Sequence, residues 1–495
     1  MTFRKYKFVE HFGNPAAGGA AGGGAAIREV RGVGKVAVHR IARIVYQEKV
    51  HVELDEETGR QREVVVYEER MGALGGYVSG YENLAQGGES WIGGDACVCG
   101  DAYVSGDADV SGSAVVSGNA RIGDKAVVRG TADVYGHASV AGSAVVEGNA
   151  DVSGQAEVEG TVSGNAKVSG SAYVGPQASV GGWAEVSGHA RIYGSVDGEA
   201  SVSGRAIVFG TVGKKATATE DAVVMKGGEL GGSAAARGSA VVAGTVSDQA
   251  VATGCAYVSA EGGLSGSAYA DGNCMVDGLV SDRASCGDNS KVGGGGLVSG
   301  SSSLYGNGTV DGSVKDSAVS GNGSVGGSLE SGAEVSGNAA VGEDGAAIGA
   351  KMTGNAAVTG RASGGKAEGS AGIAGAAVQS VVSGGCVTGV VRSGTVGGAA
   401  VVAGSATSGE AASSAVVVGG VNGGSAVGNS TIAGADFGGR ADGNAAVAGD
   451  GIEGSVGDNA VSIGGGDARG NEVVVDRDGD REPEGVGVVV RVEPR

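Results

Sequence analysis

The chain has 495 residues, of which 104 are glycine and only 4% are aromatic, so an ordinary globular core of large side chains is excluded. The formal net charge of −20 argues against binding to nucleic acid or to an anionic membrane. No signal-peptide-like segment follows Met1, and no apolar run approaches the roughly eighteen residues of a membrane span. We therefore expect a cytoplasmic protein that contacts neither nucleic acid nor membrane.

The N-terminal region, residues 1–92, differs in composition from everything after it. Residues 15–26 are rich in alanine and glycine, which predicts a linker or a loose loop inserted in this region. Residues 36–53 are rich in strand-forming side chains, residues 55–61 form a polar turn, and residues 63–67 resume the strand pattern. This order predicts a β-hairpin that caps one end of the fold.

A six-residue repeat begins directly after this cap. From Ala96 to Ala156 an alanine stands at every sixth position, and a valine or isoleucine follows two residues later. Residues i and i+2 of a strand point to the same side, so both face inward and the residue between them faces outward. Glycine, asparagine and aspartate fill the corners, where the chain turns sharply. Three such sides close a triangular coil, which is the pattern of a parallel β-helix.

After Ala156 the length of a coil alternates. The spacings between Val212, Leu230, Val246 and Leu264 are 18, 16 and 18 residues, which indicates that one side is trimmed by two residues in many coils. We predict coils of about 16–18 residues and a regular β-helix over residues 93–292. Residues 293–470 keep the repeat only in part, and we expect a degenerate continuation of the helix, with partial disorder as the alternative.

The C-terminal region, residues 471–495, contains two valine-rich segments that flank a charged loop. This pattern predicts a second β-hairpin cap. Residues 476–482 in that loop faintly resemble a calcium-binding loop, but Arg481 stands where such a loop needs glycine. We therefore favour a solvated hairpin turn and expect no metal there.

Residues 36–210 also carry a resemblance to a known family. Residues 39–44 read HRIARI, residues 74–78 read LGGYV and residues 83–92 read NLAQGGESWI, and these motifs lead straight into the repeats. This order is similar to that of the YdcK-type bacterial and prophage hexapeptide-repeat proteins, whose function is uncharacterised. The resemblance implies a left-handed triangular β-helix, a bacterial or phage setting and a place in a phage particle as an alternative to the cytoplasm. The family is sometimes labelled acyltransferase-like because of its fold.

The enzyme hypothesis requires specific residues. Hexapeptide acyltransferases need a histidine general base beside a crevice for the acyl donor. The repeats contain only His137 and His189, both at corners and about three coils apart, so we do not expect them to share a site. Two histidines also cannot supply a three-histidine zinc site. We therefore predict a non-catalytic, rod-like structural or interaction protein with no catalytic, cofactor-binding or metal residues. The alternative is an acyltransferase-like enzyme that uses an acyl-CoA donor.

The six cysteines and the outward aromatic residues give weaker signals. Cys97 falls at an outward position and Cys274 in an inward alanine slot, so we expect no disulfide framework and a reducing compartment. A lone Cys-x-Cys at Cys97 and Cys99 is a weak metal signal. The sequence leaves open self-association, as a trimer or end to end, and a protein or glycan partner, for which the outward aromatic residues are scattered candidates: Tyr103, Tyr173 and Trp183.

Overall fold

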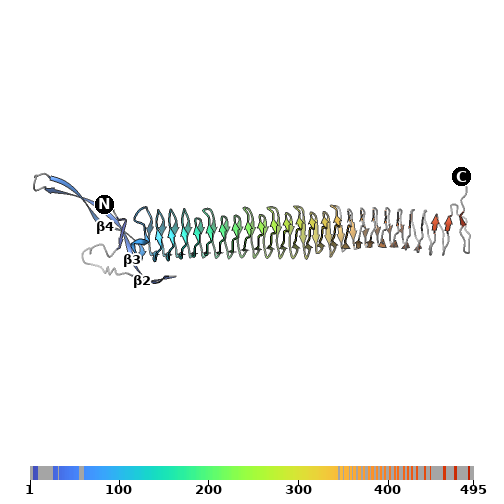
Figure 1. Ribbon diagram of the computed structural model, residues 1–495, viewed down its shortest axis with the longest axis horizontal. Helices are drawn as coiled ribbons and strands as arrows, with labels where there is room; N and C mark the ends of the chain where they lie inside the picture. The colour runs from blue at the N-terminus through green and yellow to red at the C-terminus, as the bar shows by residue number, and fades with distance from the viewer. Residues whose placement is uncertain are drawn as a thin grey trace. The chain divides into compact units, whose positions relative to one another are not determined.

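The computed structural model describes residues 4–8, 26–31, 33–54 and 61–343, and after these it describes residues 346–348, 351–355, 357–358 and a series of short strands. The described residues contain no α-helix, and their one helical turn is the 3-10 turn η2 (Tyr81–Asn83). The chain divides into two compact units, Met1–Val242 and Ala243–Arg495. In each unit, short strands stack one after another (Figure 1) and pair in parallel in three separate ladders, so the prediction of an all-β parallel β-helix is confirmed.

The coils of the first unit have three faces of two-residue strands. Face 1 consists of β6 (Cys97–Val98), β9 (Val115–Val116), β12 (Asp133–Val134), β15 (Asp151–Val152), β18 (Lys167–Val168), β21 (Glu185–Val186), β24 (Ser201–Val202), β27 (Thr217–Ala218) and β30 (Ala235–Ala236). Face 2 consists of β7 (Tyr103–Val104), β10 (Arg121–Ile122), β13 (Ser139–Val140), β16 (Glu157–Val158), β19 (Tyr173–Val174), β22 (Arg191–Ile192), β25 (Ile207–Val208), β28 (Val223–Val224) and β31 (Val241–Val242). Face 3 consists of β5 (Trp91–Ile92), β8 (Asp109–Val110), β11 (Val127–Val128), β14 (Val145–Val146), β17 (Thr161–Val162), β20 (Ser179–Val180), β23 (Ser195–Val196), β26 (Thr211–Val212) and β29 (Glu229–Leu230).

The second unit has the same three-sided coils, and the strands of each of its faces pair in parallel. Its first series begins β33 (Val251–Ala252), β36 (Tyr269–Ala270), β39 (Ser285–Cys286), β42 (Ser303–Leu304), β45 (Ala318–Val319), β48 (Glu334–Val335) and β51 (Lys351–Met352). The second series begins β34 (Tyr257–Val258), β37 (Met275–Val276), β40 (Lys291–Val292), β43 (Thr309–Val310), β46 (Ser324–Val325), β49 (Ala340–Val341) and β52 (Ala357–Val358). The third begins β32 (Thr245–Val246), β35 (Gly263–Leu264), β38 (Leu279–Val280), β41 (Leu297–Ser299), β44 (Ser313–Lys315), β47 (Ser328–Glu330) and β50 (Ala346–Ile348).

The interior of the coils follows the six-residue register. Every alanine from Ala96 to Ala156 in that register is buried, as are the valines and isoleucines two residues later. Side chains between the two, such as Arg121, lie outside. The core is therefore a narrow column of alanine and branched aliphatic side chains, and its stability accumulates from one coil to the next.

The register makes a direct prediction about stability. Ala120 is completely buried in a slot that the neighbouring side chains fill, so Ala120→Leu should overpack the interior and lower the free energy of unfolding by about 1–3 kcal/mol. The neighbouring Arg121 is exposed, and Arg121→Ser should change it by less than about 0.5 kcal/mol. Thermal unfolding followed by circular dichroism measures both. Equal shifts in the two variants would contradict the inward and outward assignment.

Coil length varies in the way the sequence predicts, and then shortens further. Arg121 pairs with Ser139, 18 residues on, and Val145 pairs with Thr161, 16 residues on. In the second unit Ser303 pairs with Ala318, only 15 residues on. This further shortening explains why the repeat is hard to follow beyond residue 293. The described strands of residues 361–447 still pair in parallel, as expected for a continuation of the helix.

One corner of the second unit carries a ladder of asparagine side chains. Each amide nitrogen donates to the amide oxygen of the asparagine in the next coil, at 2.8–3.4 Å, along the series Asn273, Asn289, Asn307, Asn322, Asn338 and Asn355. Such ladders add side-chain hydrogen bonds to the backbone ladder of stacked parallel strands. The corner is therefore reinforced outside the core.

We expect the ladder to contribute measurably to stability. Asn322→Ala removes its bonds to Asn307 and Asn338 and leaves two amides without one partner each, so the free energy of unfolding should fall by about 1–2 kcal/mol. Ser324→Ala, at an outward position two residues away, should change it by less than about 0.5 kcal/mol. Chemical denaturation compares the two variants. An Asn322→Ala protein as stable as the Ser324→Ala protein would show that the ladder is without effect.

The N-terminal cap is a β-sheet built on a long hairpin. β3 (Gly34–Leu54) and β4 (Gln61–Val78) pair antiparallel, which agrees with the expected hairpin, and both strands are longer than expected. β1 (Tyr6–Phe8) and β2 (Ala26–Val30), which the sequence did not reveal, pair antiparallel with β3. The end of β4 pairs in parallel with β6, so the hairpin passes directly into face 1 of the first coil (Figure 1).

Aromatic packing fixes the cap to the first coil. Tyr6 is completely buried, and its hydroxyl donates to the backbone oxygens of Tyr81 and Leu84 at 2.9 and 3.0 Å. The ring of Phe8 stacks between Tyr81 and His39, with centroids 4.1 and 4.6 Å away. These contacts join residues that are far apart in the sequence, which anchors the N-terminal strand.

The cap also covers an outward position, which corrects the interpretation of Cys97. The register places Cys97 outside, yet it is completely buried, together with Cys99. Val30 and Val38 of the paired strands β2 and β3 pack over the two thiols. The outward face of the first coil is therefore a second, small core, and only a long-range contact could have revealed it.

The described C-terminal strands do not form the predicted hairpin. β71 (Val473–Val475) and β72 (Val489–Val490) pair in parallel with each other, and β71 pairs in parallel with β70 (Val461–Ile463). A hairpin would require antiparallel pairing, so the expected C-terminal hairpin cap is wrong. The two valine-rich segments continue the parallel ladder instead. The charged loop of residues 476–482 lies outside the described residues.

One pair of cysteines is joined by a disulfide, although the sequence predicted no disulfide framework. Cys274 and Cys286 form a disulfide, with Cα atoms 6.0 Å apart, within the usual range. Cys274 occupies an alanine slot and Cys286 a valine slot, and both are completely buried. Inward side chains from different faces of a coil lie close together in the narrow interior. Cys274 and Cys286 can therefore form a disulfide although they occupy different positions of the repeat.

Candidate functional site

The two repeat histidines lie in exposed corners of the first unit and belong to the same column. His137 precedes β13 and His189 precedes β22 by two residues each, and the ladder from β13 to β22 takes three pairing steps. At about 4.8 Å per step, roughly 14 Å separate the two coils. The side chain of His137 contacts Asn119, at 3.4 Å. As expected, the structure does not bring the two histidines into one site.

The Cys97 and Cys99 thiols lie side by side beneath the cap. A hydrogen bond between them lowers the pKa of Cys97 and, together with burial, raises the pKa of Cys99. Among the residues that the structure describes, no group of three or more histidine, cysteine, aspartate or glutamate side chains is placed to hold a metal ion. The two thiols therefore belong to the packing between the cap and the first coil.

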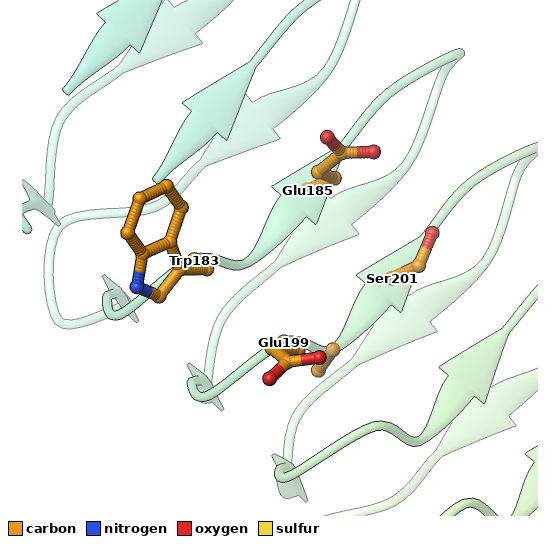
Figure 2. Close-up of a pocket in the computed structure, with 5 residues that line it drawn as sticks. Trp183, Glu185, Glu199 and Ser201 are labelled. Carbon is orange, nitrogen blue, oxygen red and sulfur yellow. The ribbon is translucent and has the colours of Figure 1, made fainter. Parts of the chain in front are cut away.

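A surface hollow of about 370 Å³ lies on the first unit beside Trp183. Trp183 and Glu199 come from corners of neighbouring coils, while Glu185 and Ser201 lie on the adjacent strands β21 and β24 of face 1 (Figure 2). The indole of Trp183 is 65% exposed, which is unusual for so large an apolar side chain. Within the described part of the chain, its N–H group has no hydrogen-bond partner.

Ion pairs surround this hollow. Glu185 accepts a hydrogen bond from Lys167 at 3.1 Å, and Glu199 pairs with Lys215 at 3.3 Å. Each pair joins one coil to the next and is well exposed to solvent. The charges of two carboxylates and two ammonium groups therefore cancel around the indole. The four side chains still offer hydrogen-bonding groups to a ligand.

A second exposed group is a column of apolar side chains at the corner between faces 2 and 3. Tyr193 stacks on Phe209, with ring centroids 5.0 Å apart and planes 11° apart, and Tyr173 packs against Tyr193 at 5.8 Å. Met225 is exposed in the next coil of the same column. The hydroxyl of Tyr173 donates to Glu159 at 2.7 Å, which raises the pKa of Tyr173 to about 12.

The geometry of the column decides what it can bind. Because Tyr193 and Phe209 stack face to face, one face of each ring is covered, which leaves less aromatic surface on which a sugar ring could stack. Trp183 has no such ring partner among the described residues. Tyr103 lies on face 2, four pairing steps from Tyr173, so the three outward aromatic residues noted in the sequence do not form one surface.

The spacing of residues by one coil length predicts more of these two surfaces than the outward aromatic residues do alone. Glu199 stands sixteen residues after Trp183, one trimmed coil on, so the coil period alone places it in the next corner. Tyr193 and Phe209 are also sixteen residues apart, and each precedes the glycine of a trimmed corner. The lysine partners follow in the same way, since Lys215 stands one trimmed coil of sixteen residues after Glu199 and Lys167 one full coil of eighteen residues before Glu185.

Two further observations concern the whole chain. In the described residues, no helix has the length and apolar character needed to cross a membrane. No protein-family model matches the chain, and no curated protein matches it either.

Proposed function

We propose that this chain is a non-catalytic structural or interaction protein, in which stacked coils present side chains at fixed spacing to a binding partner. The observation that carries the proposal is the hollow beside Trp183. It exposes an indole beside paired carboxylate and ammonium groups and has no histidine in its lining. Such a surface suits recognition, because it offers contact area and hydrogen bonds, and it lacks the histidine base that a hexapeptide acyltransferase needs.

The arrangement of the histidines supports the same proposal. An acyltransferase needs one histidine beside an acyl-donor crevice, and both His137 and His189 lie in exposed corners. Neither contributes to the hollow beside Trp183. We further propose that the chain belongs with the YdcK-type hexapeptide-repeat proteins, on the motifs of residues 39–92, and that it acts in the bacterial cytoplasm or in a phage particle.

Calorimetry with acetyl-CoA tests the proposal against the enzyme alternative. We expect no saturable heat of binding with the whole chain at micromolar concentration, and no difference for His137→Ala or His189→Ala. An exposed lysine variant, Lys125→Ala, serves as the matched surface control. Micromolar binding that either histidine variant abolishes, and that Lys125→Ala retains, would overturn the proposal in favour of an acyl-CoA-dependent enzyme.

A further inference from the structure

We propose that the hollow beside Trp183 is a binding subsite for a neutral oligosaccharide or polysaccharide. This inference rests on the proposed function, because it names the class of partner that the interaction surface takes. It starts from the exposed indole, which is the largest aromatic surface in the first unit that stacks on no other ring of the described residues. The face of an indole carries partial negative charge and attracts the polarised C–H bonds on the face of a pyranose ring.

The polar groups around the indole select against charged ligands. The Glu185 carboxylate is already balanced by Lys167, and the Glu199 carboxylate by Lys215. A cation would have to displace these lysines, whereas an anion would meet two carboxylates. A neutral polyol needs neither change, because its hydroxyl groups donate to the free lone pairs of the carboxylates and accept from the ammonium groups.

The remaining groups in the hollow also match hydroxyl-rich ligands. The indole N–H of Trp183 is a free donor, and the Ser201 hydroxyl both donates and accepts. The volume of about 370 Å³ lies at the lower end of the range of about 300–1,000 Å³ for small-molecule sites. Exposed ion pairs contribute little to stability, so their reorganisation around a ligand costs little.

The register of face 1 suggests a chain rather than a single sugar. Lys167, Glu185, Ser201 and Thr217 occupy the outward positions of four successive strands, which are about 4.8 Å apart. This row runs along the coils past Trp183, so a ligand stacked on the indole can extend along a continuous line of polar side chains. Contact with several units would raise the affinity above that of a monosaccharide.

Tryptophan fluorescence gives a specific readout, because the chain contains only Trp91 and Trp183. The full-length Trp91→Phe protein leaves Trp183 as the single reporter, and circular dichroism verifies its fold. The probes are cellopentaose, maltopentaose, laminaripentaose and chitopentaose, with tetramethylammonium chloride as the cationic competitor. We expect at least one pentasaccharide to shift the emission of Trp183 saturably, and tetramethylammonium to leave it unchanged.

Variants of the full-length chain locate the binding by calorimetry. Trp183→Ala should weaken the binding of that pentasaccharide by at least about tenfold, and Glu199→Gln by a smaller factor. Phe209→Ala, which removes an exposed ring of the same unit outside the hollow, should leave binding unchanged. Trp183 is so exposed that Trp183→Ala should keep the melting temperature of the parent.

Three results would overturn the inference: no saturable shift with any of the pentasaccharides, undiminished binding by Trp183→Ala, or stronger binding of tetramethylammonium. These outcomes are separable from failure of the proposed function. A chain that binds no pentasaccharide and no acetyl-CoA contradicts the glycan subsite alone, whereas acyl-CoA binding dependent on a histidine contradicts the proposed function itself.

Discussion

Gly210→Ala should destabilise the first unit strongly, by about 3 kcal/mol or more. Gly210 stands at a trimmed corner, that is, a corner that is two residues shorter than the others. There the chain comes so close to the next coil that a Cβ atom would overlap the carbonyl oxygens of Met225 and Gly228. Both obstacles are backbone carbonyl oxygens held by hydrogen bonds: Gly228 accepts from Thr211 in the parallel ladder, and Met225 accepts from Gly228 within its own corner, so neither can rotate away. Relief of the overlap would require the coils to separate, so the cost exceeds that of ordinary overpacking. Chemical denaturation of the full chain measures the loss.

Gly213 provides a matched control three residues away in the same coil. An added Cβ at Gly213 meets no atom within 4 Å, and its backbone lies outside the left-handed region. Gly213→Ala should therefore leave stability unchanged or raise it by about 0.4–1 kcal/mol, because alanine reduces the entropy of the unfolded chain. Similar effects of the two substitutions would refute the close approach of coils at the trimmed corners.

Deletion of residues 1–78 should convert the chain into an aggregating species. The deletion removes the end of β4, whose backbone pairs with β6, so the polar edge of face 1 becomes free. It also uncovers Cys97 and Cys99, which Val30 and Val38 now bury. A free strand edge beside newly exposed apolar surface is a template for association with another chain. Analytical ultracentrifugation should show large or end-to-end assemblies.

A point variant separates the loss of the whole cap from the loss of one surface contact. Arg31, next to β2, pairs with Asp151 and lies over the ring of Tyr135, so it ties the cap to face 1 from outside. Arg31→Ser removes this exposed contact and keeps β1 to β4, so the protein should stay unassociated and lose less than about 1 kcal/mol. If the deleted chain sedimented as a monomer of normal stability, the cap would have no protective role.

Local periodicity explains how much of the fold could be predicted from the sequence. The six-residue register predicts that Ala120 and Val128 lie inside, and the structure buries both. The trimmed coils are also predictable, because the spacing between equivalent apolar residues falls from 18 to 16 wherever one side loses two residues. The hand of the coil is different, because it rests on a family resemblance and stays a prediction.

The errors arise where the structure depends on contacts between distant parts of the chain. Cys97 has the local pattern of an outward residue, and it is buried because Val30 and Val38 fold back over it. The valines of β71 and β72 fit a hairpin as well as a parallel ladder, since alternation within a strand does not depend on the direction of its neighbour. Local pattern alone could not decide either case.

The outward aromatic pattern identifies only Trp183 of the candidate site, and the other lining residues follow once the length of the coil is known. The register identifies Trp183 as an outward aromatic residue, but its surroundings depend on which residues the next coil brings beside it. The trimmed coil of sixteen residues places Glu199 there, and face 1 adds Glu185 and Ser201 (Figure 2). A coil of eighteen residues would have placed Ser201 in that corner, so the chemistry of the hollow depends on the trimmed length.

The central claim is that this chain recognises a partner without performing chemistry, and acyl transfer by the full-length protein tests it most directly. Chromatographic detection of free coenzyme A, with acetyl-CoA as donor and a panel of amines, amino sugars and alcohols as acceptors, measures turnover. We predict release at the rate of the buffer alone. Acceptor-dependent release that disappears in His137→Ala or His189→Ala, and persists in Lys125→Ala, would contradict this claim.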